Sequence, residues 1–130
     1  MISTSTLNKI KPKKTAIPLS LIVLFGLAVR FYYVPTDLPI VSDGFFDFVY
    51  ATKTVFEGSL PIGYGTTNTG WANFLSLFFS LSDTSDPFYL MEIQRSLSII
   101  LSVLTTIPAF FIFKKFVNVR WALFGSILLI

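Results

Sequence analysis

The sequence predicts an all-α, polytopic membrane protein with two complete transmembrane helices, the start of a third, and a helical external loop. Three observations predict this class. Hydrophobic residues make up 53% of the chain and charged residues 13%, whereas soluble domains carry roughly 45–50% and about 25%. Two apolar runs are each long enough to cross a bilayer. Most basic residues precede the first run or follow the second, and all 7 acidic residues lie between the runs.

The residue inventory limits the chemistry. Cys and His are both absent, which excludes a disulfide framework, a thiolate metal site and a histidine general base. Catalysis would depend on carboxylates, Lys, Arg, Tyr or hydroxyl groups. The basic tail over residues 1–15 could indicate nucleic acid, but beside an apolar run it indicates the cytoplasmic side of a membrane. We therefore expect membrane lipid as a partner and no nucleic acid.

The first apolar run, residues 16–34, predicts transmembrane helix 1. At about 1.5 Å per residue it just crosses a hydrocarbon core of roughly 30 Å. Arg30 can extend toward the headgroups, and the aromatic residues that follow it suit the outer interface. A cleaved signal peptide is the alternative, but residues 30–33 offer no small-residue cleavage site. We favour an uncleaved anchor in the cell membrane with a cytoplasmic N-terminus.

Residues 35–92 follow as an external loop that is too polar to span and too long to lack structure. Ser42 or Asp43 can cap a helix over residues 43–57, and Gly58 can end it.

A second, shorter helix is predicted in the loop over residues 71–81, where aromatic and aliphatic side chains recur at helical spacing. This segment is too short to span, so we expect it to lie in the membrane interface.

The second apolar run, residues 93–113, predicts transmembrane helix 2. Pro108 is tolerated because neighbouring groups in a membrane protein can satisfy the freed carbonyl. Lys114 and Lys115 mark the cytoplasmic end. Residues 119–130 are apolar again, which predicts a third span that is incomplete and a longer full-length protein.

Four polar residues of the predicted helix 43–57 share one face, because they recur at i, i+4, i+7 and i+11. They are Asp43, Asp47, Tyr50 and Thr54. The apolar side consists of Phe45, Phe48, Val49 and Phe56. The functional interpretation makes Asp43 a general base or a ligand of a reacting group, with Asp47 and Tyr50 in support. The alternative is that Asp43 only caps the helix and Asp47 is solvated.

Five further residues are binding candidates. Arg30 and Arg95 fall at the outer ends of the two spans, where each could bind a lipid-linked phosphate or simply reach lipid headgroups. Tyr64, Asn68 and Trp71 could line a sugar site. Turn formation by Asn68 and interfacial anchoring by Trp71 are the structural alternatives.

The order of these features is familiar. The motifs are Arg30-Phe31-Tyr32-Tyr33, the segment 42–51 that begins Ser-Asp-Gly, Gly63-Tyr64, Asn68-Thr69-Gly70-Trp71 and Gln94-Arg95. With them the chain resembles the N-terminal part of polytopic glycosyltransferases of the GT-C type. It is most similar to the archaeal branch related to the dolichyl-phosphate-mannose protein mannosyltransferases. The resemblance covers most of residues 16–130.

The resemblance implies transfer of a sugar from a polyprenyl-phosphate donor to a protein or glycan acceptor on the non-cytoplasmic side. Asp43 matches the essential acidic residue of the first external loop, which takes the proton of the acceptor hydroxyl as that oxygen attacks the anomeric carbon. Inversion is the expected outcome. The fragment alone is expected to be inactive, because two spans and a partial third cannot enclose a donor site.

The chain departs from this pattern in one respect. The mannosyltransferases usually carry paired acidic residues in this loop, whereas here Gly44 follows Asp43. An oligosaccharyltransferase-like catalytic subunit, which would bind a divalent metal through several carboxylates, is one alternative. A transporter or flippase subunit and a non-catalytic membrane scaffold are others, and the scaffold predicts that Asp43→Asn has no effect.

Overall fold

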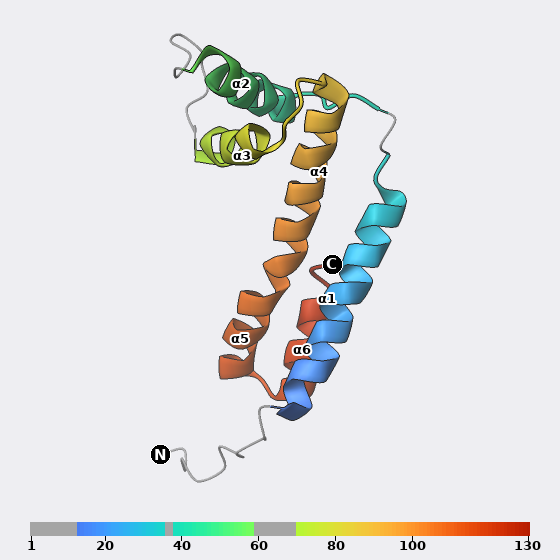
Figure 1. Ribbon diagram of the computed structural model, residues 1–130. Coiled ribbons are helices and arrows are strands. Elements are labelled where there is room, and N and C mark those ends of the chain that lie inside the picture. Colours follow the sequence, from blue (N-terminus) through green and yellow to red (C-terminus); the bar gives the residue numbers. More distant parts are fainter. Residues whose placement is uncertain (1–12, 36–37, 59–69) are drawn as a thin grey trace. The chain divides into compact units, whose positions relative to one another are not determined.

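The computed structural model describes residues 13–35, 38–58 and 70–130, which form six helices and no strand (Figure 1). The predicted all-α class is confirmed for these residues. The chain divides into two compact units. The terminal unit consists of Met1–Tyr33 and Ile99–Ile130, and the central unit is Val34–Ser98.

Two segments are long and apolar enough to cross a membrane by length and composition, Thr15–Tyr33 and Pro87–Phe116. The first belongs to helix α1, Lys13–Tyr33, which begins a few residues before the predicted span. The second combines α4, Pro87–Leu104, with α5, Thr106–Phe116. Most of their side chains are not buried within the protein, as expected for helices whose apolar surface faces lipid. Their membrane topology stays a prediction.

Helix α4 begins earlier than the predicted span 93–113. The Asp86 Oδ1 atom accepts the Phe88 N–H at 3.0 Å, so Asp86 caps the helix. Pro87 takes the first helical position, where its fixed φ is favourable and its missing N–H costs nothing. The predicted loop 35–92 therefore ends in helical residues, because an Asp-Pro start signal lies in its polar turn.

A single-residue break at Thr105 separates α4 from α5. The Thr105 N–H still donates to the Leu101 carbonyl at 3.1 Å, and the Ala109 N–H donates to the Thr105 carbonyl at 3.2 Å. Pro108 has no N–H to offer the Leu104 carbonyl, and its ring crowds that carbonyl. The irregularity thus lies one turn before the proline, inside the second apolar segment.

The core of the terminal unit contains Leu19 of α1, Phe110 of α5 and Ala122 of α6 (Val119–Ile127). The Asn118 side chain caps α6 by accepting the Trp121 N–H at 3.2 Å. A Cβ on Gly125 would lie 3.1 Å from the Phe113 ring, so glycine allows α6 to approach α5 closely. Helix α6 falls within the predicted start of a third span.

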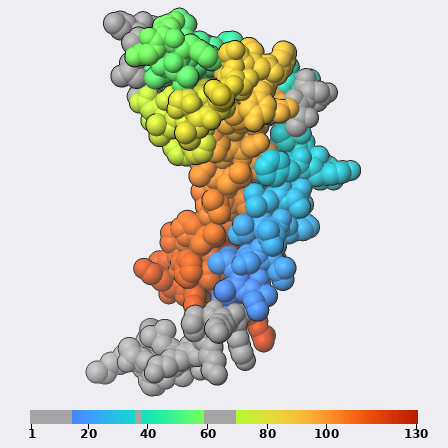
Figure 2. Space-filling model, viewed as in Figure 1, coloured from blue at the N-terminus to red at the C-terminus, as the bar shows by residue number. Residues whose placement is uncertain are grey.

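The core of the central unit forms between α2 (Asp43–Glu57), α3 (Gly70–Leu81) and the first turns of α4. Its buried residues are Phe48, Ala51, Leu75, Phe79 and Leu90. The Phe48 and Phe79 rings meet edge to face with centroids 5.8 Å apart. Figure 2 shows the side chains of α2, in green, lying against those of α3, in yellow-green. The ranges of both helices agree with the helices expected from the sequence, and the interfacial placement of α3 stays a prediction.

Candidate functional site

The first turn of α2 carries the principal candidate, Asp43, which is the first residue of the helix and is exposed. Ser42 occupies the N-cap position with φ 61° and ψ −141°, and its side chain makes no capping hydrogen bond. The expected cap by the Ser42 side chain is therefore wrong. A normal N-cap has extended backbone angles, and the positive φ of Ser42 departs from them. The Phe45 N–H instead donates to the Ser42 carbonyl at 3.0 Å.

A hydrogen bond fixes this first turn to α4. The Gln94 Nε2 atom donates to the Gly44 carbonyl at 2.9 Å, and Gln94 is only 4% exposed. A Cβ on Gly44 would lie 3.0 Å from Ile40 Cγ2 and 3.7 Å from Gln94 Nε2. Gly44, which breaks the expected acidic pair, thus allows the close approach of Ile40, while its carbonyl accepts from Gln94. The Gln94–Gly44 hydrogen bond therefore attaches the first turn of α2, which carries Asp43, to α4.

The two carboxylates of α2 are close enough to interact. Burial raises the pKa of Asp47 above its ordinary value of 3.8, and the negative charge of Asp43 raises it further. Asp47 is half-buried while Asp43 is exposed. The alternative to a catalytic site expected Asp47 to be solvated. The structure instead places it half-buried.

The burial of side chains around α2 differs from the polar face and apolar side that the spacing predicts. Tyr50 is 5% exposed and so does not belong to an accessible polar stripe, whereas Phe45 and Phe56 are 43% and 54% exposed. The helix packs through Phe48 and Ala51, which are three residues apart and face α3. Little of the Tyr50 side chain therefore reaches the surface, and its supporting role stays a prediction.

Thr54, the last member of the expected stripe, is also not directed at a site. Its Oγ1 atom donates to the Tyr50 carbonyl at 2.9 Å, within the same helix. Within the expected stripe, Asp43 is thus the exposed residue, and Asp47 is half-buried.

The two arginine candidates lie in different units. Arg30 belongs to the terminal unit, where its Nε atom donates to the Ile130 carbonyl at 3.1 Å. Arg95 belongs to the central unit, is half-buried, and directly follows Gln94 in α4. Gln94 contacts the residue after Asp43, so Arg95 is the arginine whose helix is attached to the candidate carboxylates. A shared phosphate site that uses both arginines stays a prediction.

Trp71 is the described member of the expected sugar site, and Tyr64 and Asn68 lie outside the described residues. The Trp71 ring is half-buried, packs against the core of the central unit, and stacks on Phe74 with centroids 5.6 Å apart and an interplanar angle of 23°. Phe74 therefore occupies one ring face, and sugar stacking would have to use the exposed remainder.

Gln94 and Gly44 are the residues that reasoning from the sequence did not assign to the site. An uncharged, hydrogen-bonding residue at the start of the predicted span 93–113 is the signal that could have found Gln94. Its Oε1 atom is buried and has no hydrogen-bond partner in the described part of the chain.

Among residues 13–35, 38–58 and 70–130, no three carboxylates gather as a metal-binding group. Comparison with protein-family models, with curated proteins and with solved structures finds no match.

Proposed function

We propose that the chain is part of a membrane glycosyltransferase that moves a sugar from a polyprenyl-phosphate donor to an acceptor hydroxyl on the non-cytoplasmic side. The observation that carries this proposal is the exposed Asp43 carboxylate on a helix start that Gln94 ties to α4. A general base must be accessible to its substrate and held in place by its surroundings, and Asp43 meets both conditions.

Asp43 acts as the base in this mechanism. Its carboxylate takes the proton of the acceptor hydroxyl while the acceptor oxygen attacks the anomeric carbon. The bond from that carbon to the donor phosphate oxygen breaks, and the lipid phosphate leaves with the electron pair. One displacement inverts the configuration at the anomeric carbon, and no covalent sugar–enzyme intermediate forms.

Two neighbouring residues support this role. Asp47 has a raised pKa, so it is protonated at higher pH than an ordinary carboxyl. Protonation of Asp47 lowers the repulsion between the two carboxyl groups. Arg95, on the helix that holds Gly44, is suited to the departing phosphate because guanidinium groups form multidentate contacts with phosphate oxygens.

The test measures sugar transfer from a radiolabelled polyprenyl-phosphate hexose by the full-length protein in membranes. Asp43→Asn keeps the size of the side chain and removes the base, so the rate should fall by about 10²–10⁴-fold. Glu57→Gln is the matched control, because Glu57 is an exposed carboxylate at the other end of α2. Unimpaired transfer by Asp43→Asn would remove Asp43 from its proposed role, and absence of transfer by the unsubstituted protein would favour the scaffold alternative.

The membrane sidedness is tested separately. The chain contains no Cys, so an introduced thiol gives an unambiguous label. Ser85→Cys, at an exposed residue of the central unit, should react with an impermeant maleimide from outside, and Lys115→Cys should not. The reverse pattern would place the carboxylates on the wrong side for a donor presented outside.

A further inference from the structure

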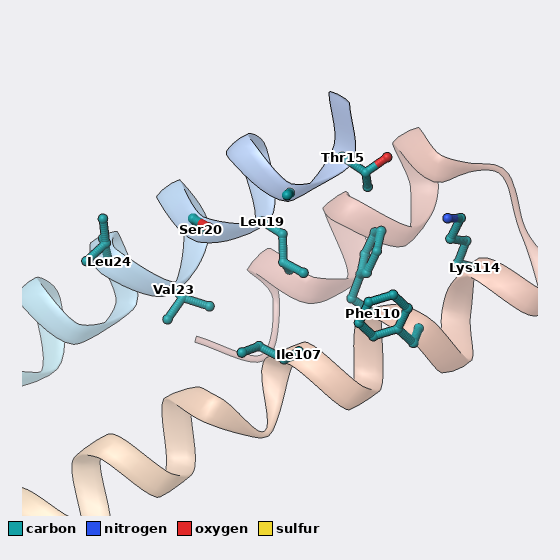
Figure 3. A pocket seen from close by; sticks show the side chains of 10 residues that line it. Thr15, Leu19, Ser20, Val23, Leu24, Ile107, Phe110 and Lys114 are labelled. Carbon is teal, nitrogen blue, oxygen red and sulfur yellow. The ribbon is translucent and has the colours of Figure 1, made fainter. Parts of the chain in front are cut away.

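The terminal unit contains a groove of about 600 Å³ between α1 and α5 (Figure 3). Its walls are mainly apolar. They include Leu19, Val23 and Leu24 from α1 and Ile107, Phe110 and Phe111 from α5. The volume lies in the range of roughly 300–1,000 Å³ that small-molecule sites occupy. The groove is therefore large enough for a flexible hydrocarbon chain, and its walls suit one.

The charged group of the groove lies at one end, and the Ser20 hydroxyl lies part of the way along the α1 wall. Figure 3 shows Thr15 of α1 and Lys114 of α5 at the end away from Leu24. Thr15 is 7% exposed, whereas Lys114 is exposed. A ligand that matches this arrangement has a long apolar part and a polar group at its end.

The charge of the terminal unit determines the sign of that polar group. Every Asp and Glu of the chain falls within residues 37–92, so the terminal unit contains no acidic side chain at all. All of the basic residues except Lys53 and Arg95 belong to it. No carboxylate side chain of this unit can neutralise Lys114, and an anion from the surroundings is therefore favoured beside it.

We propose that this groove binds one acyl chain of an anionic phospholipid, with the lipid phosphate at Lys114 and Thr15. The apolar walls bury the chain, the Lys114 ammonium pairs with the phosphate, and the Thr15 hydroxyl donates to a phosphate oxygen. The inference rests on the membrane placement that the proposed function requires, and it is independent of sugar transfer.

The test uses the full chain in nanodiscs of phosphatidylcholine that contain a trace of phosphatidylglycerol with a photoreactive diazirine on one acyl chain. After irradiation, the labelled peptides are mapped by mass spectrometry. Label is expected on the α1 and α5 walls of the groove. A phosphatidylcholine probe should label them about fivefold less, because its choline group makes the headgroup zwitterionic and one lysine then meets no net negative charge. Equal labelling by both probes would overturn the proposal.

Two variants, each with a matched control, test the ends of the groove separately. Lys114→Gln should reduce labelling by phosphatidylglycerol about fivefold, whereas Lys115→Gln, at an exposed neighbour outside the groove lining, should not. Ala16→Trp places a large ring in the groove and should abolish labelling, whereas Ala28→Trp, on an exposed part of α1 outside the lining, should preserve it. Both target residues are exposed, so neither change disturbs a core.

Other occupants give different results. A thiol introduced as Val23→Cys that cross-links to another protein or to a second copy of the chain would show that a helix fills the groove. Stronger labelling by a polyprenyl-phosphate probe than by phosphatidylglycerol would assign the groove to the sugar donor. Either result would overturn the proposal. None of these labelling or cross-linking results changes what Asp43→Asn does to sugar transfer. The two proposals can therefore fail independently.

Discussion

The hydrogen bond from Gln94 to the Gly44 carbonyl gives a sharp test of how the candidate site is held. Gln94→Glu replaces the side-chain amide by a carboxyl group and keeps the shape of the side chain. It replaces the Nε2 donor, 2.9 Å from the carbonyl, by an oxygen that cannot donate when ionised. Because Gln94 is 4% exposed, the new charge would be buried. An uncompensated buried charge costs about 3–5 kcal/mol.

Gln94→Leu provides a comparison for the free-energy cost of the buried charge. It removes the same hydrogen bond, whose net worth is about 0.5–1.5 kcal/mol. It also removes the Gln94 Oε1 atom, which is buried without a partner in the described part of the chain, so part of that loss is offset. We therefore expect Gln94→Leu to cost at most about 1.5 kcal/mol. Glu92→Gln, at an exposed position of the same helix, should change stability by less than about 0.5 kcal/mol.

The measurement is amide hydrogen exchange of α2 in the detergent-solubilised full chain. At neutral pH, Gln94→Glu should accelerate exchange by more than about 100-fold, and Gln94→Leu by about tenfold or less. When it is protonated, the introduced carboxyl can again donate to the Gly44 carbonyl. Protection should therefore recover at low pH, once the introduced carboxyl is protonated. Equal loss in both variants at neutral pH, or no recovery on acidification, would refute the role assigned to Gln94.

Three further predictions concern the central unit. Ser42→Gly should stabilise the unit by about 1 kcal/mol, because Ser42 has φ 61° and glycine adopts such angles without strain; Ser85→Gly should give no gain in the same thermal unfolding assay. Leu75→Ala should cost about 2–5 kcal/mol, because Leu75 is fully buried, while Leu77→Ala at a 62% exposed position of α3 should cost far less. Asp47→Asn should stabilise the protein at neutral pH, and the gain should shrink as the pH falls through the raised pKa of Asp47 toward 3.8, because protonation removes the same penalty from the native chain. A pH-independent difference in unfolding temperature would contradict this last prediction.

The helices could be predicted well from local signals. The sequence places a helix at 43–57, and the structure has α2 at Asp43–Glu57, because Gly58 takes φ 66° and ends the helix in the way glycine commonly does. The start of α4 is harder to predict from the sequence. Its signal is a capping Asp86 followed by Pro87, in a segment that otherwise resembles a polar turn.

The surroundings of the candidate site could not be predicted in the same way. Periodicity places Tyr50 on the same face as Asp43, but burial is decided by which elements cover the helix, and Tyr50 is 5% exposed. Likewise, the bond from Gln94 to Gly44 joins residues far apart in sequence, and no local pattern encodes such a partner. The partner of Arg30 could not be predicted for the same reason, because its hydrogen bond to the Ile130 carbonyl depends on how α1 and α6 pack.

The separation of charge between the two units gives the proposed topology its physical basis. Every acidic side chain lies in the central unit, and the terminal unit is exclusively basic. Carrying the lysine-rich segments across a bilayer would be costly, whereas a loop with few basic residues can be exported, so the positive-inside rule favours the proposed orientation with residues 35–92 outside. That orientation presents Asp43 to an external donor and leaves Lys114 with the anionic lipids of the inner leaflet. One electrostatic asymmetry therefore underlies both proposals, while the side chains that test them belong to different units.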